Sequence, residues 1–137
     1  MSYLLSIIVP TKDRYEYLKP LIELVQSFHS DDIELVIQDN TNNNTEIIDF
    51  INQVGYRHLK YFHVVEQISV AQNSDLAILN STGEYVCFIG DDDGVSYHII
   101  SAVKWMKDKG VDVLKTTMTS YKWPSFNVSR IGNFSSV

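Results

Sequence analysis

Apolar and polar positions alternate along this chain with two different periods. Compact runs rich in β-branched and aromatic residues, bounded by glycine, proline or polar turns, predict strands. These runs are Leu4–Val9, Ile33–Gln38, Leu59–Val65, Glu84–Ile89 and Val111–Thr117. Between them, apolar residues recur every three to four positions, which predicts helices. The helical segments are Tyr15–Phe28, Thr45–Val54, Val70–Asn80 and Tyr97–Lys109.

The first helical segment contains a proline, Pro20. Proline has no amide hydrogen and is tolerated best in the first turn of a helix. We therefore expect this helix to begin near Lys19.

Strands that alternate with helices of this length are typical of βαβ units, a mostly parallel sheet and right-handed crossovers. The predicted fold class is therefore α/β, and 137 residues suit one domain. In open sheets of this kind, ligands bind at the carboxyl ends of the strands. The residues that follow each strand are consequently the candidates for a site.

Polar side chains collect at the ends of three predicted strands. The segments are Pro10-Thr11-Lys12-Asp13-Arg14, Asp39-Asn40-Thr41 and Asp91-Asp92-Asp93. Any one of them has a simple explanation, because Asp, Asn and Thr are common helix caps and turn formers. Three such ends on one edge of a sheet favour a binding site.

The aspartate triplet follows an apolar run, Tyr85–Ile89, and Gly90. We interpret that run as a buried strand, so three carboxylates gather where it ends. Carboxylates crowded together raise one another's pKa unless a cation or hydrogen-bond donors share the site. The triplet therefore suggests a hard divalent metal, Mg²⁺ or Mn²⁺, with oxygen ligands. The alternative is a solvated loop that caps the next helix.

Composition excludes several classes of partner. The formal net charge is −6, and no basic cluster is present, so nucleic-acid binding is not expected. No run approaches the roughly 18 apolar residues of a membrane span, and the N-terminus lacks the basic region of a signal peptide. The one cysteine, Cys87, lies mid-strand and is expected to be a buried structural thiol. We expect a cytoplasmic protein without membrane insertion in this chain. The alternative location is peripheral, at the inner face of the membrane.

The motifs of several enzyme classes are absent. The chain has no GxGxxG, GxxxxGK[ST] or GxSxG sequence, and its histidines lack zinc-binding spacing. What remains is an acidic edge without a nucleophile. Such an edge can hold a metal against a diphosphate and offset the charge that develops as the bond to it breaks.

Three stretches together resemble the nucleotide-sugar-binding half of family 2 glycosyltransferases. They are Ser6-Ile-Ile-Val-Pro-Thr-Lys-Asp-Arg14, Leu35-Val-Ile-Gln-Asp-Asn40, and Ser69-Val-Ala-Gln-Asn73 with Thr82-Gly-Glu-Tyr-Val-Cys-Phe-Ile-Gly-Asp-Asp-Asp93. The resemblance runs from about Leu4 to Thr117, with the motifs in the family's order. It implies a Rossmann-like, three-layer GT-A domain. It also implies transfer of a sugar from a nucleotide-diphosphate donor, a UDP-sugar above all, to a polysaccharide or glycolipid acceptor with Mn²⁺ or Mg²⁺.

The resemblance also implies a role for each matching residue. Pro10, Thr11 and Asp13 would line the nucleoside pocket, and Asp39 would accept a hydrogen bond from the base or ribose. Asn73 would approach the nucleotide from the edge of the sheet. Asp91, Asp92 and Asp93 would stand for the DxD metal motif, with Asp91 also near the nucleotide-sugar. Either Asp91 and Asp93 form the metal pair, or Asp92 binds the metal directly with Asp93 beside it; Asp92 or Asp93 is favoured as the direct ligand.

The chain departs from the family pattern at three places. Gln38-Asp39-Asn40-Thr41 offers one acid where the family usually has two. Gln72 replaces an arginine that could have met the diphosphate. Gly90 stands at the first position of the acid motif, which the family often fills with aspartate.

No acidic residue follows Asp112. Inverting members of the family activate the acceptor hydroxyl with a later carboxylate, so no catalytic base can be named here. We therefore expect the front part of a longer enzyme, with residues 1–117 as the donor domain and 118–137 as the incomplete start of the acceptor side. Aromatic residues in this last segment would favour a homodimer if exposed. The alternative function is a non-catalytic nucleotide-sugar-binding module; a nucleotidyltransferase is a weaker option, because the loop after the first strand has no glycine.

Overall fold

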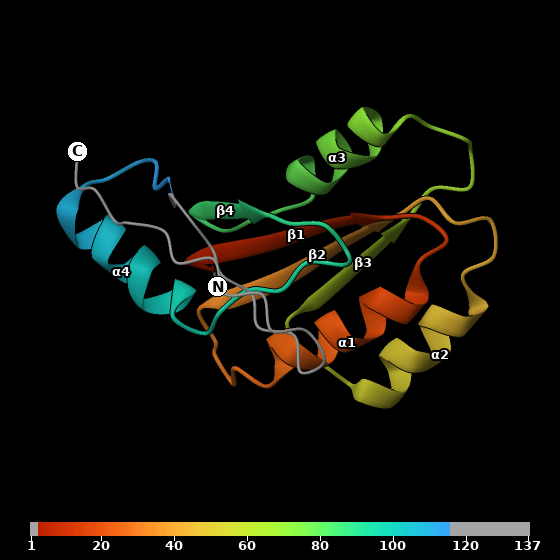
Figure 1. Ribbon diagram of the computed structural model, residues 1–137, viewed down its shortest axis with the longest axis horizontal. Helices are drawn as coiled ribbons and strands as arrows, with labels where there is room; N and C mark the ends of the chain where they lie inside the picture. Colours follow the sequence, from red (N-terminus) through yellow and green to blue (C-terminus); the bar gives the residue numbers. More distant parts are fainter. Residues whose placement is uncertain (1–2, 116–137) are drawn as a thin grey trace, which may run out of the picture. The chain divides into compact units, whose positions relative to one another are not determined.

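The computed structural model describes residues 3–115 and divides into two compact units, Met1–Trp105 and Met106–Val137. In the first unit, strands and helices alternate along the chain (Figure 1). The strands are β1 (Leu5–Thr11), β2 (Ile33–Asp39), β3 (Leu59–His63) and β4 (Tyr85–Phe88). The helices are α1 (Tyr15–Gln26), α2 (Thr45–Val54) and α3 (Val70–Leu79). A fourth helix, α4 (Ile99–Lys109), begins in the first unit and ends in the second.

The described strands form one parallel sheet of four strands in the order β3-β2-β1-β4. β1 and β2 are the central pair, and their register places Thr11 opposite Asp39. The same register carries on to β3, where His63 is opposite Asp39. The predicted α/β fold with a parallel sheet is confirmed, and the ends of the strands meet at one edge.

Helices cover both faces of this sheet (Figure 1). Alternate residues of β1 and β2, such as Ile7 and Leu35, pack with α1, α2 and the start of α4 in the larger core. The intervening residues Ile8 and Val36 face the other way and pack with Ala77 of α3. Because side chains alternate across a strand, both faces of the central strands are buried, which gives the three layers that the sequence predicts.

Pro20 lies inside α1, whose first residue is Tyr15. The prediction that this helix begins near Lys19 is therefore wrong. A proline at this position removes one hydrogen bond, to the carbonyl four residues earlier, which belongs to Glu16. Glu16 is exposed, so water can satisfy that carbonyl, and the buried face of the helix keeps Leu18 and Ile22 in the core.

The prediction that the run Tyr85–Ile89 is a buried strand also needs correction. β4 is not buried on both faces, because Val86 and Phe88 are 46% and 52% exposed. It is the outer strand of the described sheet, and the described residues leave its Val86 and Phe88 face partly uncovered. Cys87, on its other face, is half-buried, and this burial raises the pKa of its thiol.

The second unit is described as far as residue 115. α4 ends before Gly110, which has a left-handed backbone with a φ of 64°. Residues 111–115 form no strand, since valine and leucine favour a strand only where a partner and a packed face are available. The rest of the predicted fifth strand and the segment 118–137 lie outside the described residues. Among residues 3–115, no helix is long and apolar enough to cross a membrane.

A buried carboxylate lies toward the amino ends of the strands. Glu34 of β2 has no exposed surface, and its oxygens accept hydrogen bonds from Ser6 and from the backbone and side chain of Thr82. The Lys60 ammonium lies 2.6 Å from Oε2. Burial raises the pKa of the Glu34 carboxyl, but these donors together lower it more, so its pKa lies below the ordinary value. This network joins β1, β2, β3 and the turn before β4.

Candidate functional site

Thr11, the last residue of β1, is the centre of the edge where the strands end. Its hydroxyl donates a buried hydrogen bond of 2.7 Å to Asp91 Oδ2. Its carbonyl accepts from the Asn73 side-chain amide of α3 at 3.2 Å and from the backbone N–H of Asn40 at 3.0 Å. One residue thus joins β1 to the loop after β4, to α3 and to the end of β2.

Asp39 ends β2 and is wholly buried. Its Oδ2 accepts hydrogen bonds from the hydroxyls of Tyr15 and Tyr61, at 2.7 and 2.6 Å, and its Oδ1 accepts from the backbone N–H of Thr41 at 2.8 Å. Burial, with the neighbouring carboxylate, raises the pKa of Tyr15 to about 12 and also raises the pKa of Tyr61, so both hydroxyls remain donors at neutral pH. A nucleoside could reach this carboxylate only after a tyrosine moved, so the predicted contact with the base or ribose stays a prediction.

Removing one of these donors is expected to weaken the domain measurably. Tyr61→Phe should lower the free energy of unfolding by about 1.5 kcal/mol, because a hydrogen bond to a buried charged group is lost. Urea unfolding of wild type and variant would measure the difference. Tyr56→Phe, at a half-buried tyrosine that does not contact Asp39, is the matched control. Coincident curves for wild type and Tyr61→Phe would mean that the bond contributes little.

Asn73 is 5% exposed, and its amide nitrogen donates to the carbonyls of Thr11 and Gln38. α3 begins close by with a complete capping box between Ser69 and Gln72, which fixes the start of the helix. The Asn73 side-chain oxygen is buried and has no hydrogen-bond partner in the described residues. An unpaired buried acceptor at a strand edge can receive a bond from a ligand or from a water molecule.

The three aspartates after β4 have different surroundings. Asp91 is buried, and one of its oxygens accepts a hydrogen bond from Thr11. Burial raises the pKa of its carboxyl above the ordinary value, although the Thr11 hydrogen bond and the Arg14 charge both act to lower it. Asp92 is exposed and lies 2.7 Å from the Arg14 guanidinium, whose hydrogen bond lowers the pKa of that carboxyl. Asp93 is exposed too, and it accepts a bond of 2.9 Å from the N–H of Gly90.

Gly90 leaves the space in which two of these carboxylates come together. A Cβ on Gly90 would lie 2.9 Å from Asp92 Oδ1 and 3.1 Å from Asp93 Oδ2. Within residues 3–115, no three His, Cys, Asp or Glu side chains converge as a metal cage. Mg²⁺ usually takes one or two carboxylates, with waters and phosphate oxygens completing its shell. The donor chemistry of Asp92 and Asp93 therefore fits a metal that is shared with a phosphate ligand.

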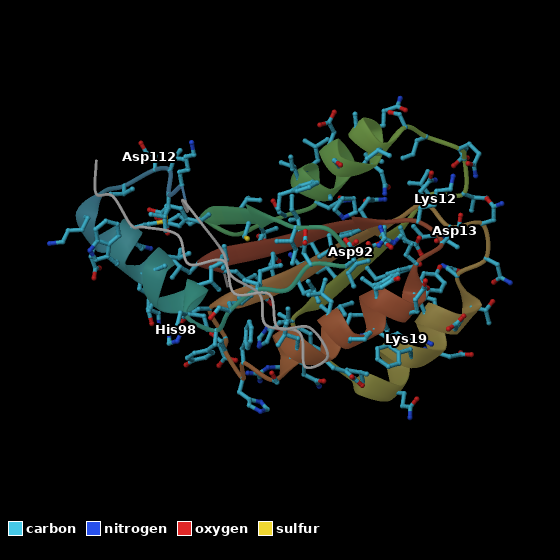
Figure 2. All side chains as sticks on the ribbon, viewed as in Figure 1. Lys12, Asp13, Lys19, Asp92, His98 and Asp112 are labelled. Carbon is cyan, nitrogen blue, oxygen red and sulfur yellow. The ribbon has the colours of Figure 1, made fainter. Side chains whose placement is uncertain are left out.

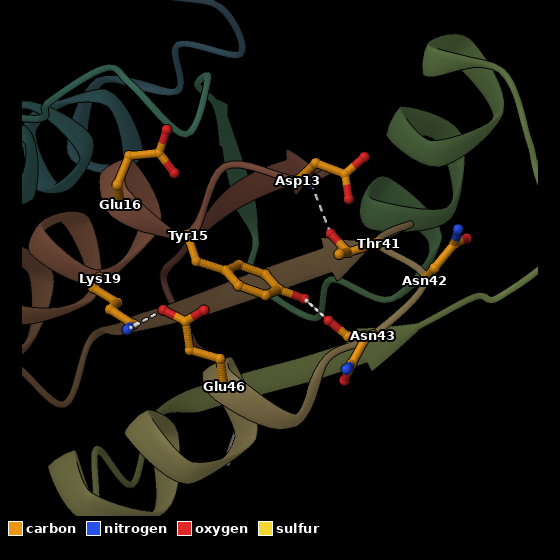
Figure 3. A pocket seen from close by; sticks show the side chains of 8 residues that line it. All are labelled: Asp13, Tyr15, Glu16, Lys19, Thr41, Asn42, Asn43 and Glu46. Carbon is orange, nitrogen blue, oxygen red and sulfur yellow. Dashed lines mark hydrogen bonds and ion pairs between the residues drawn. The ribbon is translucent and has the colours of Figure 1, made fainter.

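A hollow of about 640 Å³ opens beside this edge, between the start of α1 and the loop after β2 (Figure 3). Asp13 lies at its rim, where its backbone is left-handed and its N–H donates to the Thr41 hydroxyl at 2.8 Å. A Lys19–Glu46 ion pair of 2.6 Å lies across the hollow. None of the three aspartates after β4 lines it.

The structure brings together most of the residues that the sequence selected. Thr11 contacts Asp91 and Asn73, and lies opposite Asp39 in the register. Lys12 and Asp13 lie at the end of the sheet to which the arrows of β1 and β2 point (Figure 2). Pro10, in β1, is half-buried and pairs with Gln38.

Sequence reasoning missed Arg14 and the two tyrosines around Asp39. Arg14 could have been found from the sequence. It is a cation that follows the end of one strand, and an acidic triplet follows the end of another strand at the same edge. Tyr61 gave no such signal, because it is opposite Ile37 in the sheet and its hydroxyl reaches Asp39 only through a side-chain contact made in the fold.

A parallel sheet between two helical layers, with a polar edge where its central strands end, is the arrangement of open α/β domains in which ligands bind at the carboxyl ends of the strands. The chain belongs to glycosyl transferase family 2, whose family model matches residues 6–135. A curated relative, glycosyltransferase GlyG of Streptococcus pneumoniae, is 29% identical over 117 residues, which cover 83% of this chain and 38% of that protein.

Solved structures share the fold at lower identity. Staphylococcus aureus TarS, residues 1–349, is 20% identical with a TM-score of 0.62, covering 77% of this chain and 32% of TarS. The mannosyltransferase PcManGT of Pyrobaculum calidifontis is 19% identical with a TM-score of 0.62, covering 77% of this chain and 33% of that one. TarS has been solved with UDP and with UDP-GlcNAc, and PcManGT with GDP-Man and Mn²⁺. This chain spans about a third of the length of these relatives.

Proposed function

We propose that this chain is the donor-binding part of a glycosyltransferase that uses a nucleotide-diphosphate sugar and a divalent metal. A UDP-sugar is the first candidate donor, and the acceptor is a polysaccharide or a glycolipid. Membership of family 2 supports the class of reaction. The observation that carries the proposal is the buried Thr11–Asp91 hydrogen bond, which fixes the acid loop at the carboxyl end of the central strand.

In this proposal, the buried residues position the site and the exposed residues bind the metal. Asp91, Asn73 and Thr11 are 5%, 5% and 3% exposed and shape the edge of the sheet. Asp92 and Asp93 are exposed and would hold Mn²⁺ or Mg²⁺. Bound there, the metal would neutralise the charge of the diphosphate as it leaves the sugar. Pro10 and Asp13 would line the nucleoside pocket, and Asp39 would accept a hydrogen bond from the base or ribose once Tyr15 or Tyr61 moves away from it.

A nucleotide and Mn²⁺ together are expected to stabilise the domain. At a hundred times its Kd, a ligand stabilises the folded state by about 2.7 kcal/mol, which raises Tm by about 10 °C in a domain of this size. Thermal unfolding with UDP, GDP, dTDP or CMP, each with and without Mn²⁺, would show which nucleotide protects. If folded protein shows no shift and no calorimetric heat with any pair, the proposal is wrong.

A non-catalytic nucleotide-sugar-binding module is the second candidate. It is favoured by Gln72 and Gly90, which stand where the family pattern often has an arginine and the first aspartate of the acid motif. Both candidates predict the same nucleotide binding. They differ in turnover, so donor hydrolysis or transfer by the full-length gene product separates them.

A further inference from the structure

Arg14 connects the first loop of the sheet to the acid loop. Its guanidinium lies 2.7 Å from Asp92 Oδ2 and 3.4 Å from Asp91 Oδ1. The same group lies over the ring of Tyr17, 4.8 Å from its centre. Arg14 is the residue just before α1, whereas the two aspartates follow β4, so this contact joins segments 78 residues apart.

This arginine and a divalent metal would compete for the same carboxylate. Asp92 faces Arg14 with one oxygen and the space above Gly90 with the other. A dication on Asp92 would stand close to the guanidinium, and two like charges at such separations repel each other. The metal can bind fully only if Arg14 moves away from the acid loop.

The surroundings of Arg14 allow that movement. Its side chain is 42% exposed, and Tyr17 beneath it is 45% exposed. An exposed ion pair of this kind contributes little to stability, so its release costs little. Its guanidinium is also a planar fork of donors that matches phosphate oxygens.

The diphosphate of a donor would otherwise meet few cations at this edge. α3, which borders the edge through Asn73, contains no lysine or arginine. Lys12 lies in the same loop as Arg14, and its ammonium is hydrogen-bonded to Gln67. Arg14 is therefore the cation best placed to turn from carboxylates to phosphate.

We propose that Arg14 is an exchangeable cation: it holds Asp91 and Asp92 when no metal is bound, and moves to the donor diphosphate when the metal binds Asp92. This inference rests on the proposed function, because it needs a diphosphate ligand. Its consequence is coupling. Metal binding frees Arg14 for the diphosphate, and diphosphate binding removes Arg14 from the acids, so each ligand strengthens the binding of the other.

Replacing Arg14 by glutamine should change the two affinities in opposite directions. Arg14→Gln is expected to bind Mn²⁺ alone about threefold more tightly, because the competing cation is gone. It should bind UDP or GDP, at saturating Mn²⁺, about tenfold more weakly, because a charged hydrogen bond to phosphate is lost. Electron paramagnetic resonance of free Mn²⁺ would give the first constant, and calorimetry the second.

Two further variants make the test specific. Arg14→Lys keeps the charge without the planar fork, so it should restore wild-type Mn²⁺ affinity and recover only part of the diphosphate affinity. Arg57→Gln is the matched control, since Arg57 is an exposed arginine paired with Asp31 away from this edge. It should change neither constant.

The outcomes separate this inference from the proposed function. If wild type binds nucleotide with Mn²⁺, and Arg14→Gln alters neither affinity or both in the same direction, Arg14 is not an exchangeable cation and the proposed function stands. If wild type binds Mn²⁺ but no nucleotide, the proposed function fails, and the diphosphate half of the inference fails with it. If wild type binds neither, both are wrong.

Discussion

Glu34→Ala is expected to lower the free energy of unfolding by about 3 kcal/mol, because it removes one partner of a buried ion pair. The loss lies at the lower end of the range for such pairs, since Lys60 is 33% exposed and can be rehydrated. The backbone N–H of Thr82 and the Ser6 hydroxyl would lose their acceptor as well. Urea unfolding at neutral pH measures the change, and a curve that coincides with wild type would show that the network does not stabilise the fold.

Glu34→Gln is the matched control, because it keeps an acceptor oxygen and removes the charge. The pKa of Glu34 is lower in the folded protein than its ordinary value of 4.5. The ionised carboxylate therefore contributes stability that is fully present above pH 4.5 and is lost as the pH falls through the folded-state pKa. The stability difference between wild type and Glu34→Gln should be constant near neutrality and shrink below pH 4.5. A difference that does not change with pH would contradict this assignment.

The second large effect is expected in ligand binding and not in stability. Asp92→Ala and Asp93→Ala should each weaken metal-dependent nucleotide binding by about 100-fold or more, beyond the 10–100-fold cost of losing a group that only supports a metal ligand. Both side chains are exposed, so Tm without ligands should stay within about 2 °C of wild type, as is usual for surface substitutions. Calorimetry with UDP and Mn²⁺ gives the affinities.

Asp49→Ala controls for the loss of one negative charge, because Asp49 is an exposed residue of α2 away from this edge. Its nucleotide affinity should equal that of wild type. Unchanged affinity in both Asp92→Ala and Asp93→Ala would remove the metal assignment from these residues.

The order of strands and helices and the meeting of polar residues at one edge could be predicted from the sequence. The reason is local: buried strands have continuous apolar runs, and parallel strands bring their carboxyl ends together. Thr11, Asp39 and Asp91 follow from that geometry alone, without knowledge of any side-chain contact. The Thr11–Asp91 bond confirms that these segments meet.

The environment of each acid could not be predicted in this way. Asp91 is buried and Asp92 is exposed although they are neighbours in sequence, because successive side chains of a turn point in different directions. The burial of Asp39 beneath Tyr15 and Tyr61 depends on contacts between residues 24 and 22 positions apart, respectively. Patterns along the chain report which residues come near an edge, whereas the partner of each charge depends on contacts between distant segments.

Among the residues that the structure describes, α3 buries few side chains for a helix of ten residues. Asn73 and Ala77 are its buried residues, whereas Val70 and Leu79 are 83% and 78% exposed. Elements with few buried contacts open locally at a lower free energy than the whole fold. When α3 opens, its Asn73 amide leaves the carbonyls of Thr11 and Gln38, so the helix and the ends of both central strands loosen in one event. The rate of amide hydrogen exchange in α3 therefore measures how often the helix and the ends of β1 and β2 open.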